Sequence, residues 1–217
     1  MLEFIRVQGF KTLLDASFPL TSLNIFTGLN GMGKSTLIQA LLLLRQSYES
    51  NTLFDKGLLL KGEYASLGTG RDILAEQAEE NIMKFILTWP QHNPLQFCFD
   101  YSAHSDLQPL VAPENFEDDQ EPETKSLFNK KFQYLSADRI SPKPSYEASS
   151  YFIDDLNSLG NHGEYTAHFI AENGQDSLAL PALRHPQAVL RKLGCFGEAM
   201  GRKKRPARGP FPVDGTT

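Results

Sequence analysis

Ten residues near the N-terminus have the composition and spacing of a phosphate-binding loop. Residues 27–36 read TGLNGMGKST, and from Gly28 to Ser35 they match the pattern G-x-x-x-x-G-K-[ST]. In such a loop the glycines let the main chain adopt conformations that a Cβ would obstruct, so successive backbone amides can point at phosphate oxygens. The start of a following helix adds a partial positive charge at the same place. The pattern therefore predicts binding of a nucleotide through its phosphates.

The polar residues of this loop have different expected roles. We expect Lys34 to reach the β- and γ-phosphates and the Ser35 hydroxyl to be a ligand of Mg²⁺, while Thr36 adds a hydroxyl nearby. The residues of the loop that we expect to contact ATP are Gly28, Asn30, Gly31, Gly33, Lys34, Ser35 and Thr36. No catalytic residue can be assigned from the sequence.

The residues on either side of the loop predict the two elements that must hold it. Residues 23–27 are a short apolar run of strand length, and residues 34 to about 50 have the composition of a helix that is apolar on most of its circumference. A strand, a glycine loop and a helix, in that order, are the setting in which this motif binds phosphate. The simpler alternative is a glycine-rich turn that enters an ordinary helix, and the complete motif in its required setting disfavours it.

The loop and the residues before it resemble a known ATPase family. Asn30-Gly31 followed by Gly33-Lys34-Ser35-Thr36 is similar to the loop G-x-N-G-x-G-K-S-T of ABC-type ATPases, and more narrowly to that of the SMC, RecF and OLD branch. Residues 4–11, FIRVQGFK, are similar to the first strand and basic turn of that branch. Lys11 occupies the place of the basic residue in that turn and is a further expected nucleotide contact. Weaker similarities at residues 58–74 and 132–170 are closest to the DUF3696 group of predicted AAA-type ATPases.

This resemblance implies a fold, cofactors and partners. The expected fold is α/β, as the N-terminal lobe of an ABC/SMC-like P-loop NTPase, with a mixed β-sheet around the helix of the loop and an antiparallel β-subdomain beside it. ATP and Mg²⁺ are the implied cofactors. The implied partner is a second copy of the chain, or a partner ATPase or effector chain, because relatives of this kind hydrolyse ATP as head-to-tail dimers.

Two motifs that an ABC-type ATPase needs for hydrolysis are missing. No signature Ser-Gly-Gly segment and no apolar strand ending in Asp-Glu occur in the chain, and Tyr151–Asp155 is only a poor imitation of the latter. We therefore expect an incomplete domain that binds ATP but does not hydrolyse it alone. The alternative is a non-catalytic nucleotide-binding or interaction module that a partner chain completes. A GTPase is disfavoured because Asn129-Lys130 lacks the guanine-reading Asp, and a small-molecule kinase because no lid arginine cluster is visible.

The rest of the chain predicts several short elements. We expect strands at residues 2–8 and 13–20, 58–60, 82–89 and 95–101, and 132–135, with the first two and the pair around residue 92 forming hairpins. A helix is expected over residues 164–171, with Asn161 as its cap. Arg139 has two interpretations, a structural or nucleotide-proximal role and a surface ion pair. No glutamine can be assigned next to the nucleotide, and Gln39 and Gln77 are candidates by residue type only.

Charge and composition divide the chain. Residues 105–124 hold seven acidic residues, three prolines and no Lys or Arg, which predicts a mobile acidic insertion over 105–128. The ATPase-like part is expected to span 1–186, and 187–217 to be a disordered basic tail, which a frameshift or premature end of a longer gene would explain. Residues 189–217 have a net charge of +5 and the remainder −10, so the acidic body gives no support for DNA contact through its general surface.

The composition also sets the expected environment. No apolar stretch reaches the roughly 18 residues that a membrane-spanning helix needs, and the N-terminus has no secretory signal pattern. Two cysteines, Cys98 and Cys195, form neither a disulfide framework nor a zinc spacing. The expectation is therefore a cytoplasmic protein without a membrane partner.

Overall fold

The computed structural model describes residues 1–111, 122–138, 140–156 and 158–174. The chain divides into two compact units, residues 1–134 and residues 135–217, and each is described by itself. The expectations for Arg139 and for a basic tail at 187–217 fall outside the described residues and stay predictions. None of the described helices is long and apolar enough to cross a membrane.

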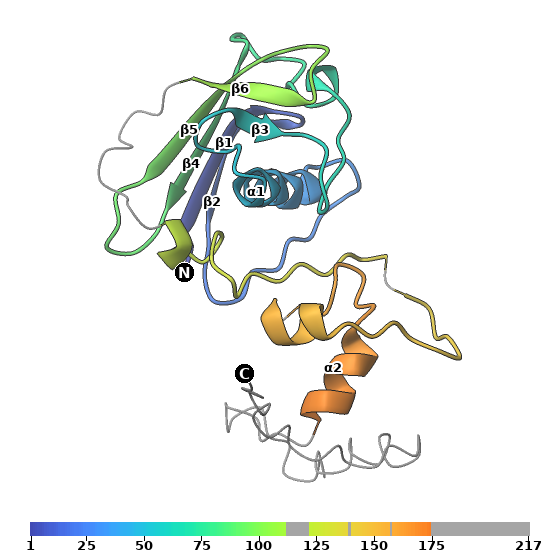
Figure 1. Ribbon diagram of the computed structural model, residues 1–217. Helices are drawn as coiled ribbons and strands as arrows, with labels where there is room; N and C mark the ends of the chain where they lie inside the picture. Colours follow the sequence, from blue (N-terminus) through green and yellow to red (C-terminus); the bar gives the residue numbers. More distant parts are fainter. Residues whose placement is uncertain (112–121, 139, 157, 175–217) are drawn as a thin grey trace, which may run out of the picture. The chain divides into compact units, whose positions relative to one another are not determined.

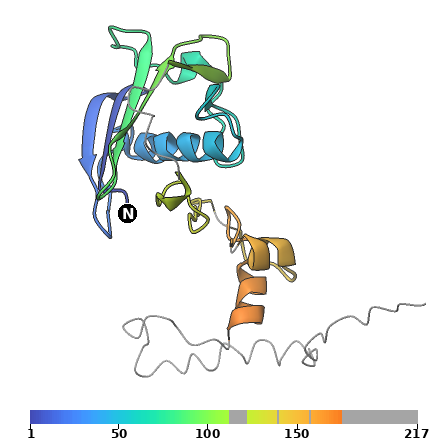
Figure 2. The same ribbon diagram turned by 60° about the vertical axis from the view of Figure 1, so that its left-hand side comes forward.

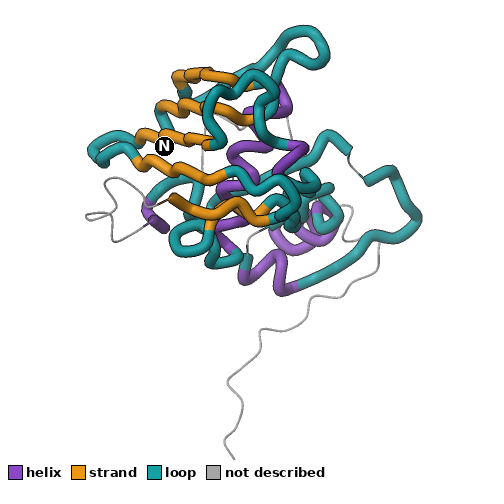
Figure 3. Tube along the Cα trace, turned by 90° about the horizontal axis from the view of Figure 1, so that it is seen from above, coloured by secondary structure: helices purple, strands orange, loops and turns teal. Residues whose placement is uncertain are grey.

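The first unit is built on a six-stranded sheet. Its strands are β1 (Phe4–Phe10), β2 (Leu13–Pro19), β3 (Gly57–Leu59), β4 (Ile82–Thr88), β5 (Leu95–Asp100) and β6 (Leu107–Val111). They are hydrogen-bonded in the order β2-β1-β4-β5-β6-β3, and every pairing between them is antiparallel. Figure 3 shows strands of this sheet, in orange, side by side. The predicted hairpins β1–β2 and β4–β5 are confirmed. The mixed sheet that we expected is not formed by the described residues, because none of their strands runs parallel to a neighbour.

One helix covers one face of this sheet. Helix α1 (Lys34–Glu49) lies against the sheet in both views of Figure 1 and Figure 2. Every second residue of the central strands is buried, as in Met83, Phe85 and Leu87 of β4, because side chains alternate between the faces of a strand. These rows pack with the apolar residues of α1 in one core. The helix predicted from residue 34 to about residue 50 is thus confirmed, and its sheet-facing side is buried.

The acidic segment is ordered at both of its ends, which corrects part of the mobile insertion predicted over 105–128. Strand β6 pairs with β5 on one side and with β3 on the other. Gln108 is completely buried there, with its side-chain amide bonded to main-chain atoms of Ser102 and Ser105. Phe128 is buried in the core at the other end. Composition alone missed this, because the pairing of β6 depends on neighbouring strands and on one buried amide whose hydrogen bonds are satisfied by Ser102 and Ser105. Residues 112–121 lie outside the description.

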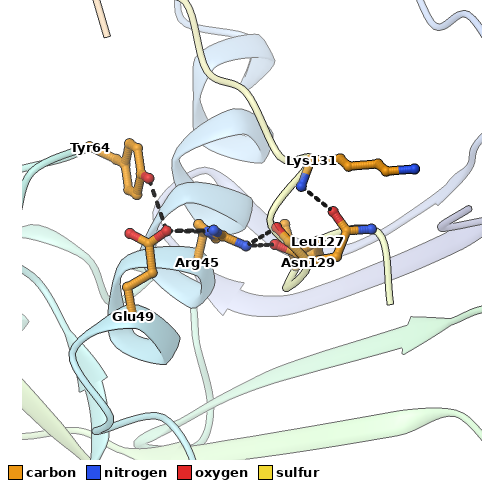
Figure 4. Close-up of polar contacts among 6 residues, drawn as sticks. All are labelled: Arg45, Glu49, Tyr64, Leu127, Asn129 and Lys131. Carbon is orange, nitrogen blue, oxygen red and sulfur yellow. Dashed lines mark hydrogen bonds and ion pairs between the residues drawn. The ribbon is translucent and has the colours of Figure 1, made fainter. Parts of the chain in front are cut away.

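A buried arginine attaches the segment after this insertion to α1. The Arg45 guanidinium is 8% exposed and donates hydrogen bonds to the carbonyl oxygens of Leu127 (3.0 Å) and Asn129 (2.8 Å). Its Nε also donates to the Glu49 carboxylate, one turn along the helix, at 2.7 Å. Figure 4 shows this cluster, in which the Tyr64 hydroxyl donates to the same carboxylate at 3.1 Å. The arginine therefore satisfies main-chain oxygens that would otherwise be buried without a donor.

The predicted strand at residues 132–135 is absent. These residues have no regular secondary structure, and they are held by side chains. The Arg45 guanidinium lies over the Phe132 ring at 4.9 Å from its centroid, and the rings of Tyr64 and Tyr134 meet edge to face at 6.3 Å. A strand needs a neighbouring strand with free main-chain groups, and here aromatic and cation–π contacts fix the segment instead.

The described part of the second unit holds one helical turn and one helix. Tyr151–Asp155 forms a π-helical turn, and α2 spans Thr166–Asn173. The rings of Phe152 and Tyr165 stack at 4.6 Å, which packs the two together. The predicted helix is confirmed with a shift of two residues, but its cap is Tyr165 and not Asn161.

Candidate phosphate-binding site

The glycines of the predicted loop adopt backbone conformations that favour glycine. The φ angles of Gly28, Gly31 and Gly33 are all positive, at 151°, 84° and 85°. Gly33 immediately precedes α1, and a Cβ there would lie 3.0 Å from Thr12 Oγ1 and 3.1 Å from Leu13 Cδ2. At this position both the backbone and the packing against the β1–β2 turn favour glycine.

Lys34 lies folded over the loop. Its Nζ donates hydrogen bonds to the carbonyl oxygens of Gly28 at 2.7 Å and Leu29 at 2.6 Å. Lys34 and Ser35 are also the first two residues of α1, so their amides are among those that a helix leaves without an intrahelical acceptor. The first turn of α1 contains no acidic side chain that would compete for this position. The Lys34 ammonium is thus bound by two main-chain oxygens. The charged oxygens of a phosphate would be stronger acceptors for the same group.

The two hydroxyl residues after the lysine have different surroundings. Ser35 is exposed, whereas Thr36 is 7% exposed and its Oγ1 lies 3.3 Å from the hydroxyl of Thr12. Ser35 is therefore the one free to approach a ligand, and the Thr36 hydroxyl faces the β1–β2 turn. No group of three or more His, Cys, Asp or Glu side chains that could hold a metal occurs in the described residues. A Mg²⁺ ion at Ser35 would take most of its ligands from phosphates and water, as is usual for this metal.

The β1–β2 turn brings Lys11 to the side of α1. Lys11 has a positive φ of 49°, and its Nζ donates to the Gln39 side chain at 3.0 Å. Its backbone nitrogen donates to the Ile73 carbonyl at 2.6 Å. Nearby, hydrogen bonds from the Thr69 amide and hydroxyl hold the pKa of Asp72 below its ordinary value, and the positive charge of Lys11 lowers it further. Lys11 thus lies beside the helix of the loop, with Gln39 as its direct partner.

Sequence reasoning missed Thr12 and gave Gln39 no role. Thr12 lies next to Gly33 and contacts Thr36, and the Gln39 side-chain oxygen accepts a hydrogen bond from the Lys11 ammonium. In the sequence, Thr12 is only a polar residue next to Lys11. Its neighbours in the chain do not indicate that it contacts Thr36, 24 positions away. Gln77, the other glutamine considered, is exposed. Asn30 is exposed in the turn of the loop.

The strand predicted before the loop does not form. Residues 23–27 have no regular secondary structure and all five are exposed. The Asn24 side chain instead closes a local turn, since its oxygen accepts from the Thr21 amide at 2.9 Å and its nitrogen donates to the Thr21 carbonyl at 2.8 Å. Figure 1 shows this blue segment running from β2 to the start of α1. A strand needs a hydrogen-bonded neighbour, and no described strand pairs with these residues.

The stretch that most resembles a hydrolytic motif adopts a different structure from the strand that the motif needs. Tyr151–Asp155, the nearest imitation of an apolar strand ending in acidic residues, is a π-helical turn and not a strand. The geometry of the loop therefore supports the binding of phosphates.

Comparison with known proteins gives one match. The family model described as an AAA ATPase domain matches residues 1–147, which is more than half of the 217 residues. No curated protein and no solved structure matches the chain. The matched range contains the whole phosphate loop, the six-stranded sheet and α1.

Proposed function

This chain belongs to the AAA ATPase domain family, whose members are ATP-binding ATPases, and on that premise we propose that Gly28–Ser35 is its ATP-binding loop. In this proposal the amides of the loop and of the start of α1 bind the phosphates, Lys34 pairs with them, and Ser35 is a ligand of Mg²⁺. Asn30 and Thr36 complete the loop. Lys11 is proposed as a further nucleotide contact, which it would make after leaving Gln39.

One observation carries this proposal. The Lys34 ammonium is held across its own loop by the oxygens of Gly28 and Leu29, at the helix end where the amides are free. A glycine-rich turn that only leads into a helix does not need a lysine at its last position. The positions of the positive charge, the free amides and the positive-φ glycines together fit a bound polyphosphate.

Replacing Lys34 tests the assignment. We expect Lys34→Ala to reduce the affinity for Mg-ATP by roughly one to two orders of magnitude or more, because hydrogen bonds to charged groups contribute about 1.5–3 kcal/mol each. The fold should stay intact, since the hydrogen bonds that Lys34 now makes are exposed. Calorimetric titration measures the affinity, and circular dichroism the fold.

Lys61→Ala is the matched control, because Lys61 is an exposed lysine that pairs with Asp106 at 3.6 Å. This variant should bind Mg-ATP as the natural chain does. Unchanged nucleotide affinity in Lys34→Ala would defeat the assignment of the site.

The finer family placement is also a proposal. The loop sequence and the basic turn at Lys11 support an SMC/RecF/OLD-like branch, near the DUF3696 group, in which the intact ATPase hydrolyses ATP on dimerisation. In this chain we propose ATP binding without turnover. A non-catalytic module completed by a partner chain is the second candidate, and the unpaired residues 23–27 favour it over an isolated enzyme. Turnover that appears only after a second chain is added would support this second candidate. Turnover by the chain alone would contradict the proposal that this chain binds ATP without hydrolysing it.

A further inference from the structure

Asparagine followed by glycine occurs twice in this chain, as Asn30-Gly31 in the phosphate loop and as Asn173-Gly174 at the end of α2. Asparagine is chemically labile, because the main-chain nitrogen of the next residue can attack its side-chain carbonyl carbon. Glycine as the next residue makes this attack easiest, since it has no Cβ to obstruct the five-membered ring that forms. The sequence gives both pairs the same risk, and the structure places them in different surroundings.

The pair in the phosphate loop is open to this reaction. Asn30 and Gly31 are both exposed, and Gly31 has a positive φ of 84°. Apart from its neighbours in the chain, no described atom would lie within 4 Å of a Cβ at Gly31. Among the residues that the structure describes, none is a hydrogen-bond partner of the Asn30 side chain or of the Gly31 N–H. The reacting nitrogen and carbon are therefore free to approach each other.

The pair at the end of α2 is held by the helix. The Gly174 N–H donates to the Ile170 carbonyl at 2.8 Å, and the Asn173 side-chain nitrogen donates to the Phe169 carbonyl at 3.2 Å. The main-chain nitrogen that would attack is thus already in use, and so is the side-chain nitrogen that would leave. The last turn of α2 must open before this pair can react.

The charges around Asn30 also favour the reaction. The attack requires the Gly31 amide to lose its proton, so negative charge develops first on this nitrogen and then on the side-chain oxygen of Asn30. The Lys34 ammonium is bound at the carbonyl oxygens of Gly28 and Leu29, which directly precede Asn30 in the chain. The start of α1 adds a partial positive charge. Both stabilise the developing anion.

We propose that Asn30 is a site of spontaneous deamidation in the nucleotide-free protein. The Gly31 nitrogen forms a bond to Cγ of Asn30, the bond from Cγ to Nδ2 breaks, and ammonia leaves after taking up a proton in exchange for the one that Gly31 lost to solvent. Water then opens the five-membered imide at either of its carbonyl carbons, which gives aspartate or isoaspartate. One side-chain amide and one water thus become one acid and one ammonia, and nothing is oxidised or reduced.

The modification inactivates the loop, an inference that rests on the proposed ATP site. A carboxylate at residue 30 puts a negative charge where the phosphates would bind. In isoaspartate the main chain also runs through Cβ of residue 30, which displaces the Gly31 amide. A bound nucleotide engages the amides of the loop and so slows the attack. ATP therefore preserves its own binding site, and the empty site is lost with time.

Peptide mapping by mass spectrometry tests the proposal in the full chain, held without nucleotide at mildly alkaline pH. It measures aspartate and isoaspartate at both pairs. We expect Asn173 to react at least about fivefold more slowly than Asn30, because the Gly174 amide must first leave its hydrogen bond. In urea this difference should disappear, since both pairs are then equally free. Equal rates in the folded chain, or a difference that persists in urea, would overturn the proposal.

A second set of measurements tests the consequence for ATP. Asn30→Asp, which carries the charge of the product, should bind Mg-ATP at least about tenfold more weakly than the natural chain. Asn173→Asp is the matched control and should bind Mg-ATP normally. Mg-ATP should slow the reaction at Asn30 in the natural chain and leave Asn173 unaffected. It should give no protection in Lys34→Ala.

The outcomes separate this inference from the proposed function. Normal Mg-ATP binding by Asn30→Asp, in a natural chain that binds it, would overturn the inactivation. Failure of the natural chain to bind Mg-ATP would defeat the ATP site and the inactivation with it. The faster reaction at Asn30 than at Asn173 would still be measured in that case, because it needs no nucleotide.

Discussion

Tyr64 shows how one residue takes its properties from its neighbours. It is half-buried beside α1, and its hydroxyl donates to Glu49 (Figure 4). Burial, and then the negative charge of Glu49, raise the pKa of Tyr64 to about 12. Both effects disfavour the phenolate.

This shift predicts a loss of stability at high pH. The unfolded chain releases the Tyr64 proton near pH 10, whereas the folded chain keeps it to about pH 12. Stability from this group is therefore complete below pH 10 and is lost as the pH rises to about 12. We expect the free energy of unfolding of the natural chain to fall by about 1 kcal/mol more than that of Tyr64→Phe over this range, after allowing for solvent screening.

Urea unfolding at a series of pH values measures this difference. Glu49→Gln is the informative companion, because removal of the carboxylate charge should lower the pKa of Tyr64 and shrink the effect. Identical pH dependence in the natural chain and Tyr64→Phe would contradict the prediction.

At the scale of elements, Arg45 joins α1 to the segment that follows residue 121. One guanidinium supplies donors to two main-chain carbonyls, to a carboxylate and to an aromatic face. The two carbonyl contacts connect residues more than 80 positions apart in the chain. The helix of the phosphate loop is thereby held between the sheet on one side and residues 127–132 on another part of its surface.

Removing this arginine should destabilise the first unit. We expect Arg45→Ala to lower the free energy of unfolding by about 2–4 kcal/mol, because it leaves buried carbonyls without donors and a carboxylate without its partner. Arg6→Ala is the matched control. Arg6 also pairs with a carboxylate, that of Asp15 at 2.6 Å, but both side chains are more than 40% exposed, so its loss should cost much less stability than the loss of Arg45. Chemical denaturation compares the two, and equal losses would show that the Arg45 cluster is no more than a surface contact.

At the scale of the whole molecule, the composition of the site predicts binding without turnover. The described residues provide a phosphate loop, and Tyr151–Asp155, the nearest imitation of an apolar strand ending in acidic residues, forms a π-helical turn. Mg-ATP should raise the midpoint of thermal unfolding, since a ligand at 100 times its dissociation constant stabilises the folded state by about 2.7 kcal/mol. The buried Trp89, at 2% exposed, gives a fluorescence signal for this transition.

Phosphate release in the same sample completes this prediction. We expect the natural chain and Lys34→Ala to release phosphate equally slowly, while only the natural chain is stabilised by Mg-ATP. A release rate that Lys34→Ala abolishes would mean that the chain contains a hydrolytic group which neither its sequence nor its described structure identifies.

Features that depend on local sequence were predictable from the amino acids alone. The loop from Gly28 to Ser35, the helix that begins at Lys34 and the two hairpins β1–β2 and β4–β5 all follow from patterns within about twenty residues. Positive φ at glycine, helical amphipathicity and a tight turn between alternating strands are local energies, so the residues that decide them are neighbours in the chain.

The tertiary structure decided what depends on distant partners. Leu23–Thr27 has the composition of a strand but has no strand beside it, whereas Leu107–Val111 lies in an acidic stretch and becomes a strand because β5 and β3 flank it. Residues 132–135 likewise lost their predicted strand to the contacts of Arg45 and Tyr64. A strand is stabilised by hydrogen bonds that another segment supplies, so its formation depends on whether that segment is present at its edge.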